Sequence, residues 1–193
     1  WRVMTNAVAG KEMAAAALGL PTNLTPTQLV QTWRNKSKRM QLTPVQEVTK
    51  GPILENVLST PDIDLGNFPT PRWHESDGGR YLGTGDIVIT QDPDSGQINL
   101  GTYRMMVLGR DEIGLYISPG HHGRLHRDKY FAQGKPMPVA AVFGMDPLLL
   151  VAGGENLPSS TNEYEWVGAI KNEPVEIFRG SVTGLPIPAH AEI

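Results

Sequence analysis

The stretch 96–109, GQINLGTYRMMVLG, decides the interpretation of the chain because it reads as one buried β-strand that carries two polar side chains, Asn99 and Arg104. Side chains alternate along a strand, so Asn99 and Tyr103 share one face and Arg104 lies on the other. A bulge at Gly101 is therefore needed if Asn99 and Arg104 serve one site. The alternative is structural: Asn99 ends a strand or fills a bulge, and Arg104 pairs with a neighbouring carboxylate.

Short β-type segments continue on both sides of this stretch after Pro44. They are bounded by turn signals such as Asp92–Gly96 and Gly109–Glu112. The further segments with this pattern are 45–50, 85–90, 113–118, 138–144, 147–153, 175–180 and 181–187. Closely spaced strands joined by hairpins are typical of an antiparallel barrel or sandwich. The sequence therefore predicts an α+β fold whose residues 45–193 form a mainly antiparallel β-framework.

Helical patterns occur in two places. Residues 1–44 predict a helical segment, with one helix in 11–20 and a second over 27–38 that Thr25 and Gln28 open as a capping box. Two more helices are inserted into the β-framework, at 122–134 and 162–172.

Composition excludes several classes of protein. The chain has 193 residues, 39% of them hydrophobic, and a formal charge of −3, which is typical of a globular domain and argues against a nucleic-acid partner. There is no cysteine, which excludes disulfides and thiolate metal sites and fits a cytoplasmic protein. The longest apolar stretch is interrupted by Gly144, Asp146 and Pro147, so we predict no membrane span.

The ends of the sequence indicate a piece of something longer. The chain begins at Trp1 rather than at a methionine, and it stops within a strand-like segment, PAHAEI. We therefore expect further segments on both sides.

Two side-chain patterns have competing interpretations. His122 and His126 have the i,i+4 spacing of a zinc pair, but Gly123 stands where the H-E-x-x-H motif needs glutamate, so a zinc hydrolase is not expected. Ser160–Glu163 has the capping-box pattern, in which Glu163 would bond to the Ser160 amide and do no chemistry.

An asparagine oxygen, an imidazole nitrogen and a carboxylate would together suit Mn²⁺ or Mg²⁺, and such an ion could hold a phosphate. The sequence contains no P-loop and no GxSxG elbow, and nothing orders its serines and histidines into a triad. The residues alone therefore indicate a β-rich domain with a candidate metal and phosphate site.

Four segments in order, 71–107, 118–147, 162–180 and 185–193, resemble the central portion of the UbiD family of decarboxylases. Among them are QDPDSGQINLGTYRMMV, SPGHHGRLHRDKYFAQG and NEYEWVGAIKN. The resemblance covers residues 45–193 strongly and the helical start more loosely. It implies a split β-barrel of the flavin-reductase type that binds prenylated FMN through its phosphate, with Mn²⁺ (or Mg²⁺) and K⁺.

The resemblance also implies the site. The matching metal and phosphate ligands are Asn99, His122 and Glu163, and the residues matching the segment that cradles the cofactor are Leu100, Gly101, Thr102, Arg104 and His121. Arg104 is implied as the catalytic residue that orients the substrate carboxylate, because a guanidinium can hold a carboxylate in a bidentate fork.

The implied reaction is the reversible, non-oxidative decarboxylation of an aromatic or α,β-unsaturated carboxylic acid. The family's catalytic glutamates and C-terminal domain lie beyond Ile193, so we expect this chain alone to be weakly active or inactive and its longer parent to be a homo-oligomer. Two alternatives stay open: a split-barrel oxidoreductase that uses ordinary FMN, and a scaffold module without enzymatic activity.

Overall fold

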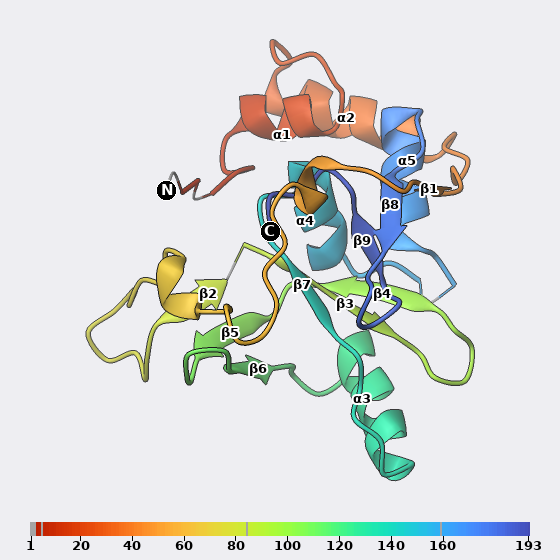
Figure 1. The fold of residues 1–193 in the computed structure, drawn as a ribbon. Coiled ribbons are helices and arrows are strands. Elements are labelled where there is room, and N and C mark those ends of the chain that lie inside the picture. Colours follow the sequence, from red (N-terminus) through yellow and green to blue (C-terminus); the bar gives the residue numbers. More distant parts are fainter. Residues whose placement is uncertain (1–2, 5, 84, 159) are drawn as a thin grey trace.

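The computed structural model describes residues 3–4, 6–83, 85–158 and 160–193, which fold into a mixed α+β structure (Figure 1). The α-helices are α1 (Lys11–Ala17), α2 (Pro26–Ser37), α3 (His122–Ala132), α4 (Pro147–Gly154) and α5 (Glu163–Lys171), and two 3₁₀ turns are η1 (Pro52–Leu54) and η2 (Leu65–Asn67). The strands are β1 (Gln46–Glu47), β2 (Tyr81–Gly83), β3 (Ile87–Gln91), β4 (Ile98–Gly101), β5 (Arg104–Val107), β6 (Ile113–Tyr116), β7 (Ala140–Val142), β8 (Glu176–Arg179) and β9 (Pro186–Pro188).

The strands of the described residues form three three-stranded sheets, in the orders β4-β3-β7, β2-β5-β6 and β1-β8-β9, and no closed barrel. Every strand pair is antiparallel except β1 with β8. The mainly antiparallel α+β prediction is confirmed, whereas the assembly of these sheets into a split barrel stays a prediction.

The stretch 96–109 forms two strands in two different sheets, so its interpretation as one buried strand is wrong. The chain leaves the first sheet after Gly101 and enters the second at Arg104. The Tyr103 ring folds back over Gly101, where a Cβ atom would lie 2.3 Å from the ring. Only glycine accommodates this approach, and it allows the chain to change sheet within two residues.

The sheet β4-β3-β7 is the centre of the molecule. Helices α3 and α4 both contact β3 and β4, and Figure 1 shows them on opposite sides of these strands. The main core cluster joins this sheet to α4, α5 and the sheet β1-β8-β9, and it includes Ile87, Ile89, Leu100, Leu149, Tyr164 and Ile177. A smaller cluster of Val88, Tyr103, Met105 and Ile117 joins β3 to the second sheet. Both sides of the central sheet are therefore buried.

Segment 147–153 is a helix, and its prediction as a strand is wrong. The Asp146 side chain caps α4 by accepting a hydrogen bond of 2.8 Å from the Leu148 amide, and Pro147 occupies the first turn. Its PLLLVAG sequence is apolar on every side, and such a run fits a buried helix as well as a buried strand.

Other local predictions have mixed outcomes. The Thr25–Gln28 capping box is present with both of its hydrogen bonds, and α2 follows it. Helices α3 and α5 also form where they were predicted. The strands predicted over 45–50 and 181–187 are wrong in extent, because pairing is limited to β1 and β9.

The helices of segment 1–44 lie at one end of the molecule, next to α4 and α5 (Figure 1). Trp33 of α2 meets Trp166 of α5 edge to face, with ring centroids 5.9 Å apart. In the described part of the chain no helix has both the length and the apolar character needed to cross a lipid bilayer.

Candidate functional site

Asn99 and Glu163 are buried polar residues from different elements, and both act on Tyr103, Asn99 through its side chain and Glu163 through its charge. Each is 6% exposed. Burial raises the pKa of Glu163 to about 7, and the Leu100 backbone amide opposes that shift. Neither Asn99 Nδ2 nor Glu163 Oε2 has a hydrogen-bond partner among the described residues. A buried donor and a buried acceptor are thus both left unsatisfied, which is costly in a fold without a ligand.

The start of α5 explains the position of Glu163. Asn162 is the N-cap, and its side chain accepts a hydrogen bond of 2.9 Å from the Tyr164 amide. Glu163 is therefore the first helical residue and not the third, so its interpretation as the glutamate of a capping box is wrong. The buried Tyr164 hydroxyl donates to the Pro186 carbonyl at 2.8 Å and fixes this helix end on β9.

Tyr103 joins the site to α3, and it is not among the residues predicted from the sequence. Burial raises its pKa, the nearby Asn99 side chain opposes this effect, and the charge of Glu163 adds to it. Its ring lies edge to face with His121 at 5.9 Å, and a Cβ atom on Gly123 would lie 2.9 Å from its hydroxyl. The sequence indicated Tyr103 only through strand alternation, which places it on the same face as Asn99.

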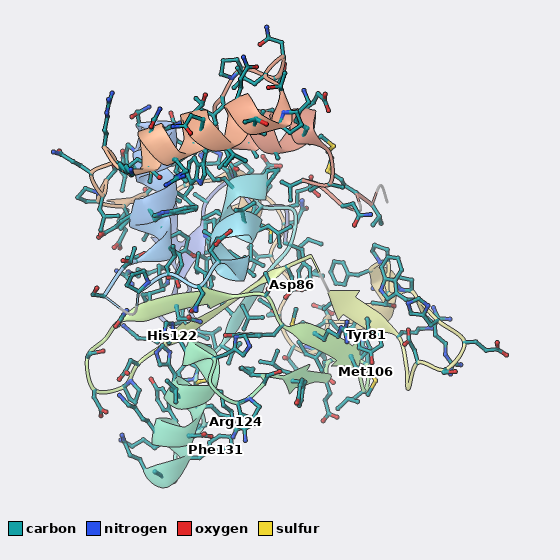
Figure 2. All side chains as sticks on the ribbon, turned by 180° about the vertical axis from the view of Figure 1, so that it is seen from behind. Tyr81, Asp86, Met106, His122, Arg124 and Phe131 are labelled. Atoms are coloured by element: carbon teal, nitrogen blue, oxygen red, sulfur yellow. The ribbon has the colours of Figure 1, made fainter. Side chains whose placement is uncertain are left out.

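The two histidines at the start of α3 have few contacts. His121 is exposed at the N-cap position, and the side chain of the half-buried His122 forms no hydrogen bond or ion pair with a described residue. Figure 2 shows His122 at the end of α3 that meets the central sheet. His122 therefore has free ring nitrogens next to the sheet that carries Asn99.

A zinc pair of His122 and His126 is not formed. The buried His126 is used elsewhere, because its Nδ1 lies 3.0 Å from Thr90 Oγ1. Within the described ranges no three His, Cys, Asp or Glu side chains are grouped to hold a metal. Since the ligand set implied by the resemblance contains an asparagine, this finding does not test it.

The segment from Leu100 to Arg104 runs from the core to the surface. Leu100 and Gly101 are buried, Thr102 donates its amide to the Gly153 carbonyl of α4 at 3.3 Å, and Arg104 is exposed. Arg104 forms no ion pair with any residue that the structure describes, so the alternative in which it pairs with a neighbouring carboxylate is not observed. Its guanidinium is available to a ligand.

Asp86 is a second buried carboxyl group that the sequence did not reveal. It is 0% exposed, and neither carboxylate oxygen has a hydrogen-bond partner in the described part of the chain. Burial raises its pKa to about 7. Figure 2 shows it at the start of β3, and a Cβ atom on Gly83 would lie 2.5 Å from its Oδ1. In the sequence, the only indication of this close packing was the presence of Gly83 and Gly85 just before Asp86.

Comparisons with known proteins give the family of the chain. The family model "UbiD: 3-octaprenyl-4-hydroxybenzoate carboxy-lyase Rift-related domain" matches residues 45–193. A pyrrole-2-carboxylic acid decarboxylase of Pseudomonas aeruginosa is 35% identical over 179 residues, which are 93% of this chain and 36% of the relative. A phenolic acid decarboxylase of Escherichia coli O157:H7 is 30% identical over 196 residues. The match covers 100% of this chain and 41% of the relative.

Solved structures share the fold. The vanillic acid decarboxylase of Sedimentibacter hydroxybenzoicus in its closed form has a TM-score of 0.85 at 30% identity, over 94% of this chain and 39% of that one. The UbiD-class enzyme HmfF of Pelotomaculum thermopropionicum, solved in complex with FMN, has a TM-score of 0.82 at 27% identity. The match covers 94% of this chain and 40% of that enzyme chain. The chain thus spans about two fifths of the length of these proteins. On these findings, the chain belongs to the UbiD family.

Proposed function

We propose that this chain is the cofactor-binding part of an enzyme that decarboxylates an aromatic or α,β-unsaturated carboxylic acid reversibly and without oxidation. The observation that carries the proposal is the pair of unsatisfied buried atoms, Asn99 Nδ2 and Glu163 Oε2. Relatives named as pyrrole-2-carboxylic acid, phenolic acid and ferulic acid decarboxylases support the class of substrate.

The residues fit a divalent cation beside a phosphate. Asn99, His122 and Glu163 offer an amide oxygen, an imidazole nitrogen and a carboxylate, a set that suits Mn²⁺ or Mg²⁺. The Glu163 carboxylate is buried without a partner for Oε2, and a cation would offset the cost of burying its charge. The Asn99 amide donor would suit a phosphate oxygen. We propose that the same site takes K⁺ as a second ion.

A prenylated flavin is the cofactor that we propose for this site. Solved relatives bound to FMN and to prenylated FMN support it. Leu100, Gly101 and Thr102 would lie along the flavin, with His121 beside the metal-binding histidine. When bound, the cofactor would supply the electron sink for the pair of electrons that loss of CO₂ leaves behind.

Arg104 would perform the substrate-orienting step. It is the exposed cation of this segment and has no ion-pair partner in the part of the chain that the structure describes. A guanidinium holds a carboxylate through two parallel hydrogen bonds, which fixes the plane of the acid and the bond that faces the cofactor. Such positioning lowers the barrier by orientation rather than by proton transfer.

The proposal extends to the surroundings of the site. We propose that β4-β3-β7 and β2-β5-β6 belong to a split barrel formed by residues 45–193, with 1–44 as part of a separate lobe. We also propose a cytoplasmic, homo-oligomeric parent protein. The lack of cysteine supports the compartment, and a dimeric form of one solved relative supports the assembly.

Metal-dependent flavin binding tests the proposal. The fluorescence of FMN or prenylated FMN is titrated with the chain, with and without Mn²⁺, and the unchanged protein is compared with His122→Ala and Glu163→Ala. Glu165→Ala, on the same turn of α5, and His190→Ala, at an exposed histidine, are the matched controls.

We expect tight binding only with Mn²⁺, lost in both site variants and kept in both controls. Equal binding without metal would instead favour the FMN-dependent oxidoreductase. If neither flavin binds under any condition, the proposed cofactor site is wrong.

A further inference from the structure

Helix α3 contacts the β3–β4 hairpin through one polar face. His122, His126 and Lys129 follow each other at spacings of four and three residues, so they share a face of the helix. His126 Nδ1 lies 3.0 Å from Thr90 Oγ1, and Lys129 Nζ lies 2.6 Å from Asp92 Oδ2 at the hairpin turn. Two successive contacts therefore fix the helix along the hairpin, and His122 is the next residue of the same face.

The strand register places Asn99 next to the first of these contacts. Thr90 of β3 is directly opposite Asn99 of β4 in the antiparallel pair. Residues directly opposite each other point to the same side of a sheet. The Thr90 hydroxyl that meets His126 therefore stands beside the Asn99 side chain, on the side of the sheet that α3 covers.

The contact between His126 and Thr90 is protected from water. Thr90 is 0% exposed and His126 is 6% exposed. Burial lowers the pKa of His126, which favours the neutral ring with one N–H and one acceptor nitrogen. Asp92 Oδ2 lies 3.9 Å from Nε2 and favours the proton there. The Thr90 hydroxyl then donates to Nδ1, and loss of either group would leave the other buried without a partner.

We propose that Thr90 and His126 are positioning residues that set where α3 lies along β4, so that His122 reaches the cation that Asn99 and Glu163 bind, and that Lys129 with Asp92 fixes the far end of the same contact. This inference rests on the proposed metal site. It assigns no chemistry to His126, whose nitrogens face Thr90 and Asp92. A shift of the helix by a fraction of a turn would move His122 without unfolding the domain.

Mn²⁺ affinity measured by electron paramagnetic resonance tests the inference, because the signal of the free ion disappears on binding and no flavin is needed. The full 193-residue chain is compared with Thr90→Val, which keeps the shape but removes the hydroxyl, and with Thr90→Ser, which restores it. Thr70→Val is the matched control, at a buried threonine in the loop before β2. His122→Ala defines the loss of the metal site itself.

We expect Thr90→Val to weaken Mn²⁺ binding about tenfold, the effect typical of residues that orient a metal ligand, and Thr90→Ser and Thr70→Val to bind like the unchanged chain. Lys129→Gln, on the surface, should weaken it about twofold. If Thr90→Val does not fold, as judged by circular dichroism, the Mn²⁺ affinity of Lys129→Gln becomes the deciding measurement. The Lys129 side chain is 41% exposed and lies outside the core.

Two results would overturn the inference, and they differ. If the unchanged chain binds Mn²⁺, His122→Ala does not, and the deciding variant binds like the unchanged chain, the positioning role is wrong and the metal site stands. If the unchanged chain and His122→Ala bind Mn²⁺ equally weakly, the metal site of the proposed function is wrong, and the positioning role is wrong with it.

Discussion

The two sheets that share the stretch 96–109 differ in how they are covered. In the sheet β4-β3-β7, every residue of β4 is buried and helices lie on both sides. In the sheet β2-β5-β6, Arg104, Ile113 and Tyr116 are exposed. The first sheet holds Asn99 in a closed environment, whereas the second presents Arg104 at an open surface. A chain of six residues from Asn99 to Arg104 thus joins a closed region to an open one, and under the proposed function these would be the cofactor side and the substrate side.

The largest expected effect tests whether the difference in cover is also a difference in stability. Ile89 is fully buried in β3, so Ile89→Ala should lower the free energy of unfolding by about 2–5 kcal/mol. Ile113 of β6 is 38% exposed, and Ile113→Ala should lower it by less than about 1 kcal/mol. Urea denaturation measures both values. Equal losses would mean that the two sheets are equally important for stability.

The connection between the sheets can be disturbed at Gly101. A Cβ atom there would lie 2.3 Å from Tyr103, so Gly101→Ala should cost about 1–3 kcal/mol as the ring is displaced. Gly154→Ala, at the end of α4, meets nothing within 4 Å and serves as the control. Thermal unfolding measures both variants. A Gly101→Ala protein as stable as the control would contradict the close packing of Tyr103.

Asp86 makes the junction of the two sheets sensitive to pH. Its pKa in the folded protein is raised from 3.8 to about 7, so the folded state keeps a proton that the unfolded state has lost. This contribution to stability is complete below pH 3.8 and is lost as the pH rises through about 7.

Asp86→Asn removes the ionisable group. It should therefore gain stability relative to the unchanged protein, by about 1–2 kcal/mol, when both are moved from pH 6 to pH 8. Melting temperatures of both proteins at the two pH values measure the gain. A difference between the two proteins that stays constant with pH would show that Asp86 is not protonated in the fold.

The smallest expected effect on stability is at Arg104. Because its side chain is exposed and forms no ion pair with a described residue, Arg104→Met should change the free energy of unfolding by less than about 0.5 kcal/mol. Under the proposed function, the same variant should lose its affinity for an aromatic acid in the cofactor-loaded protein, as measured by calorimetry. A destabilised variant would show that Arg104 has a structural role.

Local signals in the sequence predicted local structure well. The Thr25 capping box and the helices at 122–134 and 162–172 depend on short-range hydrogen bonds and on periodicity, and they formed as predicted. The strand predicted at 147–153 failed because a run that is apolar on every side carries no periodicity. The cap of α5 was misplaced because several capping residue types follow one another in 159–162, and the sequence does not rank them.

The site itself stays a prediction. Resemblance to a family selected Asn99, His122 and Glu163, and in the structure the Asn99 side chain and the charge of Glu163 both act on Tyr103. No pattern revealed that Tyr103 closes over Gly101, that His126 meets Thr90, or that Asp86 is unpaired. These features depend on which elements pack together, and neighbours along the chain do not encode such contacts.

The edge-to-face pair of Trp33 and Trp166 gives the molecule an optical signal of its own. The two rings are 5.9 Å apart at 80°, and Trp166 lies three residues after Glu163 on α5. Two indoles this close couple their electronic transitions, which produces a signal in circular dichroism that vanishes when either ring moves away. The N-terminal helices therefore report optically on the helix that carries Glu163, without any added label.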